Sequence, residues 1–195
     1  MSRNKMMQYE GLEAGDARFH PYLNEPYTRV LVLLDLRNIV ASLSNGYPDA
    51  EIDFGKLNAE ALDGRRCASA FAVDGTFGED EWRHSRIQDM AHMGGFTLVK
   101  VHATNGCGKQ EGTDVMLSSI ATEYVCEDKC DCVVFITGDG DFACLAEKLQ
   151  KRGIAVEVMS FVDSLSGCLR HAANKVTILD DLPLTRIRNS EEAIL

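Results

Sequence analysis

The sequence lacks any long hydrophobic run. None of its apolar stretches approaches the roughly 20 residues that a membrane-spanning helix requires. The N-terminal segment, MSRNKMMQYEGLEAGDARFH, also lacks the apolar core of a secretory signal. Both absences argue against a membrane partner and against export, so we expect a cytoplasmic protein.

Basic residues are scarce as well. The chain has 20 Lys and Arg against 30 Asp and Glu, which gives a formal net charge of -10. Because phosphate binding normally depends on Lys and Arg, this balance argues against a broad nucleic-acid surface. It does not exclude a local site at which a bound cation reverses the potential.

A paired cysteine framework is missing too. The chain has 7 cysteines, an odd number, whereas a disulfide scaffold pairs an even number. The cluster of Cys126, Cys130 and Cys132 suggests zinc, but it lacks a second ligand pair at zinc-finger spacing. We therefore expect reduced thiols. Several fall in apolar or helical segments as small core residues: Cys67, Cys132, Cys144 and Cys168.

Apolar runs of strand length alternate with helical patterns along the chain. The predicted strands are 29–34, 67–73, 96–101, 133–136, 154–159 and 176–179. The predicted helices are 39–43, 53–62, 79–93, about 113–126, one after Asp141, and 164–173 with Ser164 as N-cap. This alternation predicts an α/β fold with a central, mainly parallel sheet covered on both faces.

One compact domain is the expectation for 195 residues. Residues 1–27 are polar and show no periodicity, which indicates a flexible N-terminal arm. We place the domain at residues 28–182 and a charged, frayed tail at residues 183–195.

Acidic residues gather where strands end or helices begin. The run Val133–Ile136 ends in Thr137-Gly138-Asp139-Gly140-Asp141, Asp35 follows the first strand, and Asp114 opens a helix. Ligands bind at the carboxyl edge of open α/β sheets. Taken singly, each acid has an ordinary role as a cap, a turn former or a helix-dipole partner. Together at one edge they predict a cation site.

Such a cluster needs a counter-charge. Two carboxylates about 4 Å apart repel by roughly 4 kcal/mol at a protein-like dielectric, so the site requires a cation or raised pKa values. Hard oxygen ligands favour Mg²⁺ or Mn²⁺ over zinc. An ion of this kind generates a hydroxide nucleophile and stabilises the charge that develops on a phosphodiester.

Four ordered motifs resemble those of NYN domains, the PIN-like group that includes LabA-like proteins. Thr137–Phe142, followed by Lys151–Val156, resembles the S/T-G-D-S-D-F…G-x-x-V signature of that family. Lys109–Leu117 is similar to K-x-K-G-V-D-V-x-L, and Asp35–Ile39 to D-x-x-N-L/I. Ser166–Asn174 resembles the closing S-x-x-L-R-x-A-A-D.

The resemblance implies a three-layer α/β/α PIN-like (Rossmann-like) fold and a metal-dependent endoribonuclease. In active members a Mg²⁺- or Mn²⁺-activated water hydrolyses RNA phosphodiesters. By motif position, the catalytic and metal-binding acids are Asp35, Asp114, Asp139 and Asp141. Asn38 would orient a ligand, water or substrate. The other candidate contacts to RNA are Arg37, Lys109, Ser166 and Arg170, whose ordinary alternatives are solvated charges or a helix cap.

Four positions depart from the family pattern. Ile120 stands where a further Asp is frequent, and Gly140 replaces Ser. Asn174 replaces Asp, and Glu111 stands where a basic residue is common. These departures leave open a non-catalytic, RNA- or protein-binding regulatory NYN domain. A Toprim-like phosphatase or nucleotidyl enzyme is a more remote alternative, because its early catalytic Glu is replaced by Asp35. The sequence also leaves open a homodimer.

Overall fold

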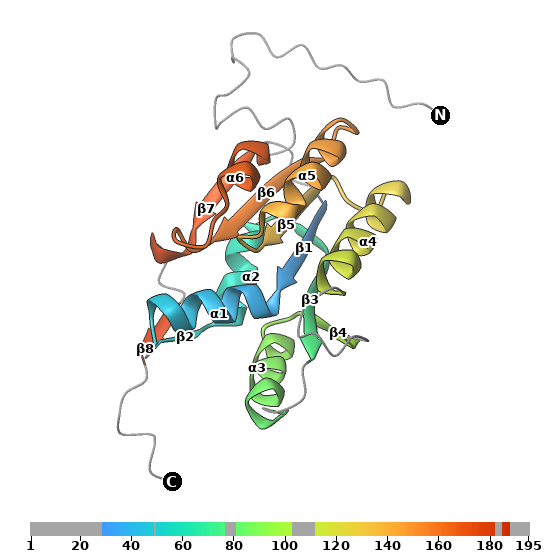
Figure 1. The fold of residues 1–195 in the computed structure, drawn as a ribbon. Helices are drawn as coiled ribbons and strands as arrows, with labels where there is room; N and C mark the ends of the chain where they lie inside the picture. The colour runs from blue at the N-terminus through green and yellow to red at the C-terminus, as the bar shows by residue number, and fades with distance from the viewer. Residues whose placement is uncertain (1–28, 49, 77–80, 103–111, 182–184, 188–195) are drawn as a thin grey trace, which may run out of the picture.

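The computed structural model describes residues 29–48, 50–76, 81–102, 112–181 and 185–187 (Figure 1). The predicted arm 1–27 lies outside the described residues, as do Lys109, Glu111 and most of the predicted tail.

Six parallel strands form the central sheet, in the order β4-β3-β1-β5-β6-β7. Their bounds are β1 Arg29–Asp35, β3 Arg66–Thr76, β4 Thr97–His102, β5 Cys132–Ile136, β6 Ala155–Ser160 and β7 Lys175–Ile178. The prediction of a parallel α/β sheet is therefore confirmed. The chain builds outward from β1 in one direction and from β5 in the other. The carboxyl ends of β1 and β5 thus flank the point where the strand order reverses, which is where ligands bind in open α/β sheets.

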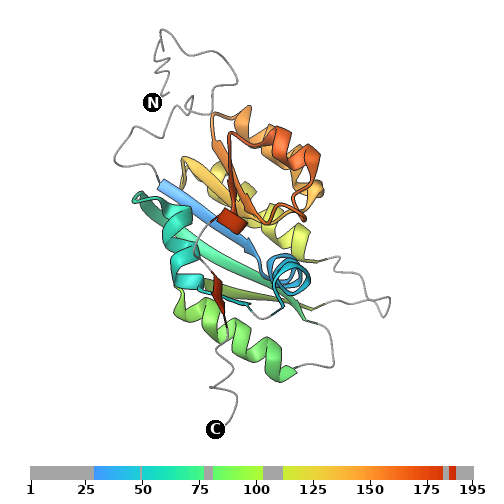
Figure 2. The same cartoon turned by 90° about the vertical axis from the view of Figure 1, so that its left-hand side faces the viewer.

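Helices cover both faces of this sheet (Figure 2). One face carries α1 (Leu36–Gly46), α2 (Phe54–Leu62) and α3 (Glu81–Met93). The other carries α4 (Thr113–Cys126), α5 (Ala143–Gln150) and α6 (Gly167–Ala172).

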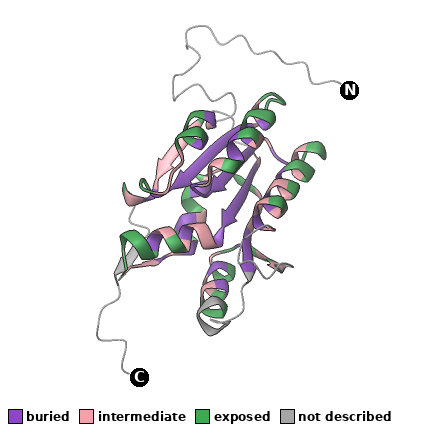
Figure 3. Ribbon diagram, viewed as in Figure 1, coloured by how far each residue is buried: buried purple, intermediate pink, exposed green. Residues whose placement is uncertain are grey.

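The side chains of β1 alternate between two hydrophobic clusters, as the period of a strand requires. Val30, Val32 and Leu34 pack in the cluster under α1 to α3, and Leu31 and Leu33 pack in the cluster under α4 to α6. The central strands are therefore buried on both sides (Figure 3).

Helix α1 is longer than the predicted 39–43. It begins directly after β1, because the Asp35 side chain accepts a hydrogen bond from the backbone N of Asn38 and caps the helix. The opposite error occurs at α6, which begins at Gly167, so the prediction of Ser164 as its N-cap is wrong. Ser164 belongs to the preceding turn, where its backbone N donates to the carbonyl of Phe161.

A small antiparallel pair was missed. Strand β2 (Ala50–Ile52) pairs with β8 (Thr185–Ile187), so the expectation of a frayed tail is wrong for these three C-terminal residues. Each strand is only three residues long, too short to show a period of two in the sequence. Two short 3₁₀ helices complete the described elements, η1 (Gly140–Phe142) and η2 (Leu179–Asp181).

The cysteines of the described residues are free thiols. Cys132 is buried as predicted, but Cys67, Cys144 and Cys168 are exposed, so the core prediction is wrong for them. The sheet separates Cys130 and Cys132, which pack in the clusters of opposite faces. No cysteine joins a group of metal ligands in the described part of the chain, which argues against the zinc alternative.

None of the helices among the described residues combines the length and the apolar character needed to cross a bilayer.

A buried ion pair ties the start of β3 to β6. The guanidinium of Arg65 donates from Nη1 to Oε1 of Glu157 at 2.7 Å and from Nη2 to Oε2 at 2.9 Å. The two side chains are 7% and 5% exposed. Arg65 also donates to the carbonyls of Ala61 and Leu62. Because both charges are out of water, each depends on the other for its stability.

We expect Glu157→Gln to lower the free energy of unfolding by about 3 kcal/mol, because the substitution leaves the Arg65 charge buried without its counter-ion. Urea denaturation at pH 7 measures the change. Glu147→Gln, an exposed acid on α5, is the matched control. Equal midpoints for the two variants would contradict this account.

Candidate metal centre

Three carboxylates meet at the carboxyl edge of the sheet. Asp114 lies in the first turn of α4, Asp139 precedes η1, and Asp141 lies within η1. Each offers a carboxylate oxygen, and the three atoms all lie within 4.8 Å of one another. Oxygen ligands of Mg²⁺ sit at about 2.1 Å, so small side-chain rotations would let one divalent cation contact all three.

Local hydrogen bonds shape the acidic turn. The Asp139 side chain accepts from the backbone N of Asp141 at 3.0 Å, and Thr137 Oγ1 accepts from the backbone N of Asp139 at 3.2 Å. Gly138 packs so tightly that a Cβ there would lie 2.1 Å from the carbonyl oxygen of Ser164. A larger residue at this position would have to displace the backbone of Ser164, so the turn requires glycine here.

Asn38 joins the acidic turn to α1. Its Oδ1 accepts from the backbone N of Gly138 at 2.9 Å. The backbone N of Asn38 in turn donates to Oδ1 of Asp35 at 3.1 Å. One residue thus connects the ends of β1 and β5. Asn38 thus holds the acidic turn, and its predicted role in orienting a ligand, a water or the substrate stays a prediction.

Asp35 lies behind the three acids and is only 2% exposed. Its Oδ2 accepts from Thr137 Oγ1 at 3.5 Å. Burial raises the pKa of Asp35 to about 6, against the hydrogen bond from Asn38, and the charges of Asp114 and Asp139 add to the rise. Asp35 is not part of the group within 4.8 Å. It interacts with Asp114 and Asp139 of that group electrostatically. Its role as a ligand stays a prediction.

Asp114 is half-buried, and its pKa is raised, first by burial and then by the charges of Asp139 and Asp141. Protons are therefore held more tightly here than by a free carboxylate, which is the expected response of clustered acids that have no counter-ion.

Arg37 points away from this cluster. Its Nε forms an ion pair with Asp74 at 2.9 Å, and Gln88 Nε2 donates to the other oxygen of Asp74 at 2.6 Å. Asp74 alternates with Val73 along β3 and therefore faces the side of α1 and α3. The structure thus gives Arg37 a role in joining α1 to β3 and α3. Asp74 was not predicted as a partner, although it ends an apolar run of the sequence.

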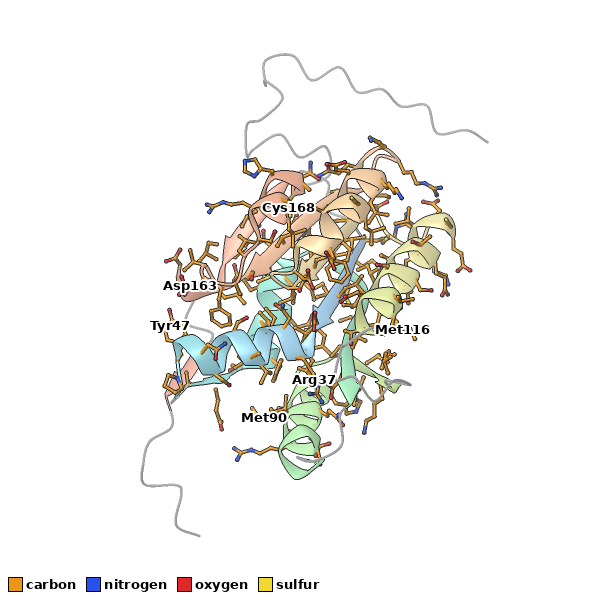
Figure 4. The ribbon with its side chains drawn as sticks, in the orientation of Figure 1. Arg37, Tyr47, Met90, Met116, Asp163 and Cys168 are labelled. Carbon is orange, nitrogen blue, oxygen red and sulfur yellow. The ribbon has the colours of Figure 1, made fainter. Side chains whose placement is uncertain are left out.

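Ser166 and Cys168 lie against the other side of the acidic turn. The backbone N of Ser166 donates to the carbonyl of Gly138 at 2.9 Å, and its Oγ lies 2.8 Å from the Cys168 sulfur. A Cβ at Gly140 would come within 2.6 Å of Ser166 Oγ and 2.7 Å of that sulfur. The glycine that departs from the family pattern therefore fits these neighbours. Figure 4 shows Cys168 on α6, the helix that also carries the exposed Arg170.

Two other departures lie away from the acids. Ile120 packs on the hydrophobic cluster under α4. Asn174 stands at the amino end of β7, the opposite edge of the sheet. Its Oδ1 there accepts from the backbone N of Val156 at 2.8 Å and from Gln150 Nε2 at 2.9 Å. Both residues serve packing or strand pairing, and neither belongs to the group of three acids.

The raised pKa of Asp35 predicts a pH-dependent stability in metal-free protein. The folded state binds this proton more tightly than the unfolded chain, so the contribution of Asp35 to stability falls between about pH 4 and pH 6 and is level above that. Asp35→Asn removes this loss. In EDTA, we expect the change that it causes in the free energy of unfolding to be about 2–3 kcal/mol more stabilising at pH 7 than at pH 4.

Urea denaturation at both pH values measures this, with Asp89→Asn, an exposed acid on α3, as control. The account is wrong if the asparagine variant keeps the pH dependence of the unchanged protein.

The sequence and the fold both resemble those of known proteins. The family model of the NYN domain matches residues 29–180. The crystal structure of a protein of unknown function from Vibrio parahaemolyticus aligns with a TM-score of 0.68 at 22% identity, covering 80% of this chain and 96% of that one. At that identity the likeness shows the fold alone.

A putative oxidoreductase from Parabacteroides merdae aligns with a TM-score of 0.31 at 12% identity, covering 75% of this chain and 28% of that one. This value is too low to bear on fold or function. No curated protein matches the sequence. With the family model matching from β1 to η2, the chain belongs to the NYN domain family, part of the PIN-like superfamily.

Proposed function

We propose that this chain is a Mg²⁺- or Mn²⁺-dependent endoribonuclease that hydrolyses phosphodiester bonds of RNA. The observation that carries the proposal is the group of three carboxylates, from Asp114, Asp139 and Asp141, at the switch point of the sheet. Asp35, buried at the end of β1, is close enough for its charge to interact with those of Asp114 and Asp139.

The donor set fits a hard divalent cation. All three side chains offer oxygen, and no sulfur or imidazole belongs to the group within the described residues. Carboxylate oxygens suit Mg²⁺ and Mn²⁺, whereas zinc prefers nitrogen and sulfur. Asp141 is exposed, so one side of the site is open to water and to a substrate. When bound, such an ion lowers the pKa of a coordinated water and neutralises charge on the phosphodiester.

The protein's own contribution is positioning. Asn38 and Thr137 hold the acidic turn through Gly138 and Asp139, and Ser166 holds its far side. Arg170, exposed on α6, and Lys109, outside the described residues, are the basic side chains we propose for contacts with the RNA backbone. They would provide local positive charge on a chain whose net charge is -10.

The alternative of a non-catalytic NYN domain that binds RNA or protein loses part of its basis. It rested on the acidic surface and on departures from the family pattern, and two of these departures, Ile120 and Asn174, serve packing or strand pairing away from the acids. A third, Gly140, fits against Ser166 and Cys168. The fourth, Glu111, lies outside the described residues.

We expect the purified protein to cleave a fluorescently labelled single-stranded RNA in Mg²⁺ or Mn²⁺, and EDTA to abolish cleavage. Asp114→Asn and Asp139→Asn should each lower the rate by more than about 100-fold, because loss of a ligand exceeds the 10- to 100-fold cost typical of its supporting residues. Asp89→Asn should cleave at the unchanged rate.

RNA that binds but is not cleaved at any Mg²⁺ or Mn²⁺ concentration would support the non-catalytic alternative. Cleavage that survives both substitutions would come from a contaminant or from another site, and would contradict the proposal.

A further inference from the structure

A cavity of about 170 Å³ opens between the C-terminal half of α1 and the loop from β6 to α6. Tyr47 and Phe161 line it together with Asp163 and Asp180. Figure 4 shows Tyr47 and Asp163 near each other at the end of α1. None of these residues has a part in the acidic cluster.

An aromatic wall is held in place on one side of the cavity. The Tyr47 ring is 40% exposed and packs on the buried Phe161, with ring centroids 5.9 Å apart. The Tyr47 hydroxyl donates to Oδ1 of Asp180 at 2.7 Å, and the backbone N of Val162 donates to Oδ2 of Asp180 at 2.8 Å. The ring is therefore held in one orientation, with part of its surface exposed for a planar group to stack on.

The polar lining consists mainly of acceptors. Asp163 and Asp180 contribute carboxylates, and the Ser42 hydroxyl donates its proton to the carbonyl of Asn38 at 2.6 Å, which leaves its lone pairs for a ligand. Asn45 contributes one side-chain amide, and no Lys or Arg is among the described residues that line the cavity. Such a lining repels anions and selects a ring that carries a hydrogen-bond donor.

The volume limits what can enter. An apolar cavity of about 150 Å³ holds one benzene ring, so 170 Å³ accommodates a single six-membered ring. A whole nucleotide does not fit.

The cavity and the acidic turn share one framework. Gly138 is fixed by Asn38 of α1 on one side and packs against Ser164 of the β6–α6 loop on the other. The same helix and the same loop continue into the cavity walls. From Asn38 to Asn45 the helix rises roughly 10 Å at 1.5 Å per residue, a distance that a short single-stranded segment can span.

We propose that this cavity binds a cytosine base of single-stranded RNA next to the phosphodiester held at the acidic cluster. The inference rests on the proposed ribonuclease function and adds a base preference to it. Cytosine offers an exocyclic amino group to the acidic lining, whereas uracil presents an oxygen at that position. The single ring of a pyrimidine needs less of the 170 Å³ than the two fused rings of a purine.

Binding can be measured without cleavage in the Asp139→Asn background, using fluorescence anisotropy in Mg²⁺ buffer. The probes are a labelled uridine decamer, the same decamer with cytidine at alternate positions, and one with adenosine there. We expect the cytidine probe to bind about tenfold more tightly than the uridine probe. Relative to the uridine probe, the adenosine probe should show a smaller increase in affinity than the cytidine probe.

Variants of the cavity test where the preference arises. Tyr47→Ala should weaken binding of the cytidine probe about tenfold, while Tyr47→Phe should retain it through stacking. Asp163→Asn should bring the two affinities close together, because its amide can donate to uracil. Asp181→Asn removes a neighbouring charge that does not line the cavity, and should keep the preference.

Equal affinity of the Asp139→Asn protein, without any cavity substitution, for the cytidine and uridine probes would overturn the proposal, whether or not the unsubstituted protein cleaves RNA. So would a preference that survives both Tyr47→Ala and Asp163→Asn. Equal RNA affinities together with Asp163-dependent binding of N-acetyl-arginine amide would assign the cavity to a guanidinium instead. Failure of the ribonuclease function appears separately, as cytidine-selective binding without metal-dependent cleavage.

Discussion

The hydrogen bond from the backbone N of Gly138 to Oδ1 of Asn38 connects the two halves of this fold at its reactive edge. It joins the end of β1, where Asp35 caps α1, to the end of β5, where the acidic turn begins. A second, longer hydrogen bond, from Thr137 Oγ1 to Asp35 Oδ2 at 3.5 Å, also ties the start of this turn to the cap of α1. The position of the candidate metal centre, and of the cavity beyond it, depends on these two contacts.

Electrostatic repulsion is the cost of the arrangement. Carboxylates about 4 Å apart oppose each other by roughly 4 kcal/mol per pair. The pKa values of Asp35 and Asp114 are raised first by burial and then by this repulsion in metal-free protein. A folded domain that keeps acids in such a place gains most from a bound divalent cation. The net negative charge of the chain argues against RNA binding. Part of that charge lies at this cluster, where a bound cation would neutralise it.

Much of this could be predicted from the sequence. The apolar run 133–136, followed by two acids and two glycines, indicates a buried strand and a turn at its carboxyl end. Residues 29–34, followed by Asp35, show the same pattern of an apolar strand that ends in an acid. Since parallel strands end at one edge, the meeting of Asp114 with Asp139 follows once α4 packs over β1.

Other features depend on three-dimensional neighbours that no local pattern reveals. Arg37 forms its ion pair with Asp74, 37 residues later, so its sequence context suggested an RNA contact or a solvated charge and did not reveal this partner. Three-residue strands such as β2 and β8 are too short for a periodic signal. The cysteine predictions failed where an apolar segment has one solvent-facing side, as at Cys67 and Cys144. The fit of Gly140 against Ser166 and Cys168 likewise required coordinates.

The central claim is that Asp114, Asp139 and Asp141 together hold one divalent cation. Anomalous diffraction from crystals soaked in Mn²⁺ tests it most directly. The account predicts one strong peak whose ligands are oxygens of these three side chains, at about 2.0–2.4 Å, and loss of that peak in Asp139→Asn crystals. Mn²⁺ peaks confined to other surface acids, with these three carboxylates bound only to water, would contradict it.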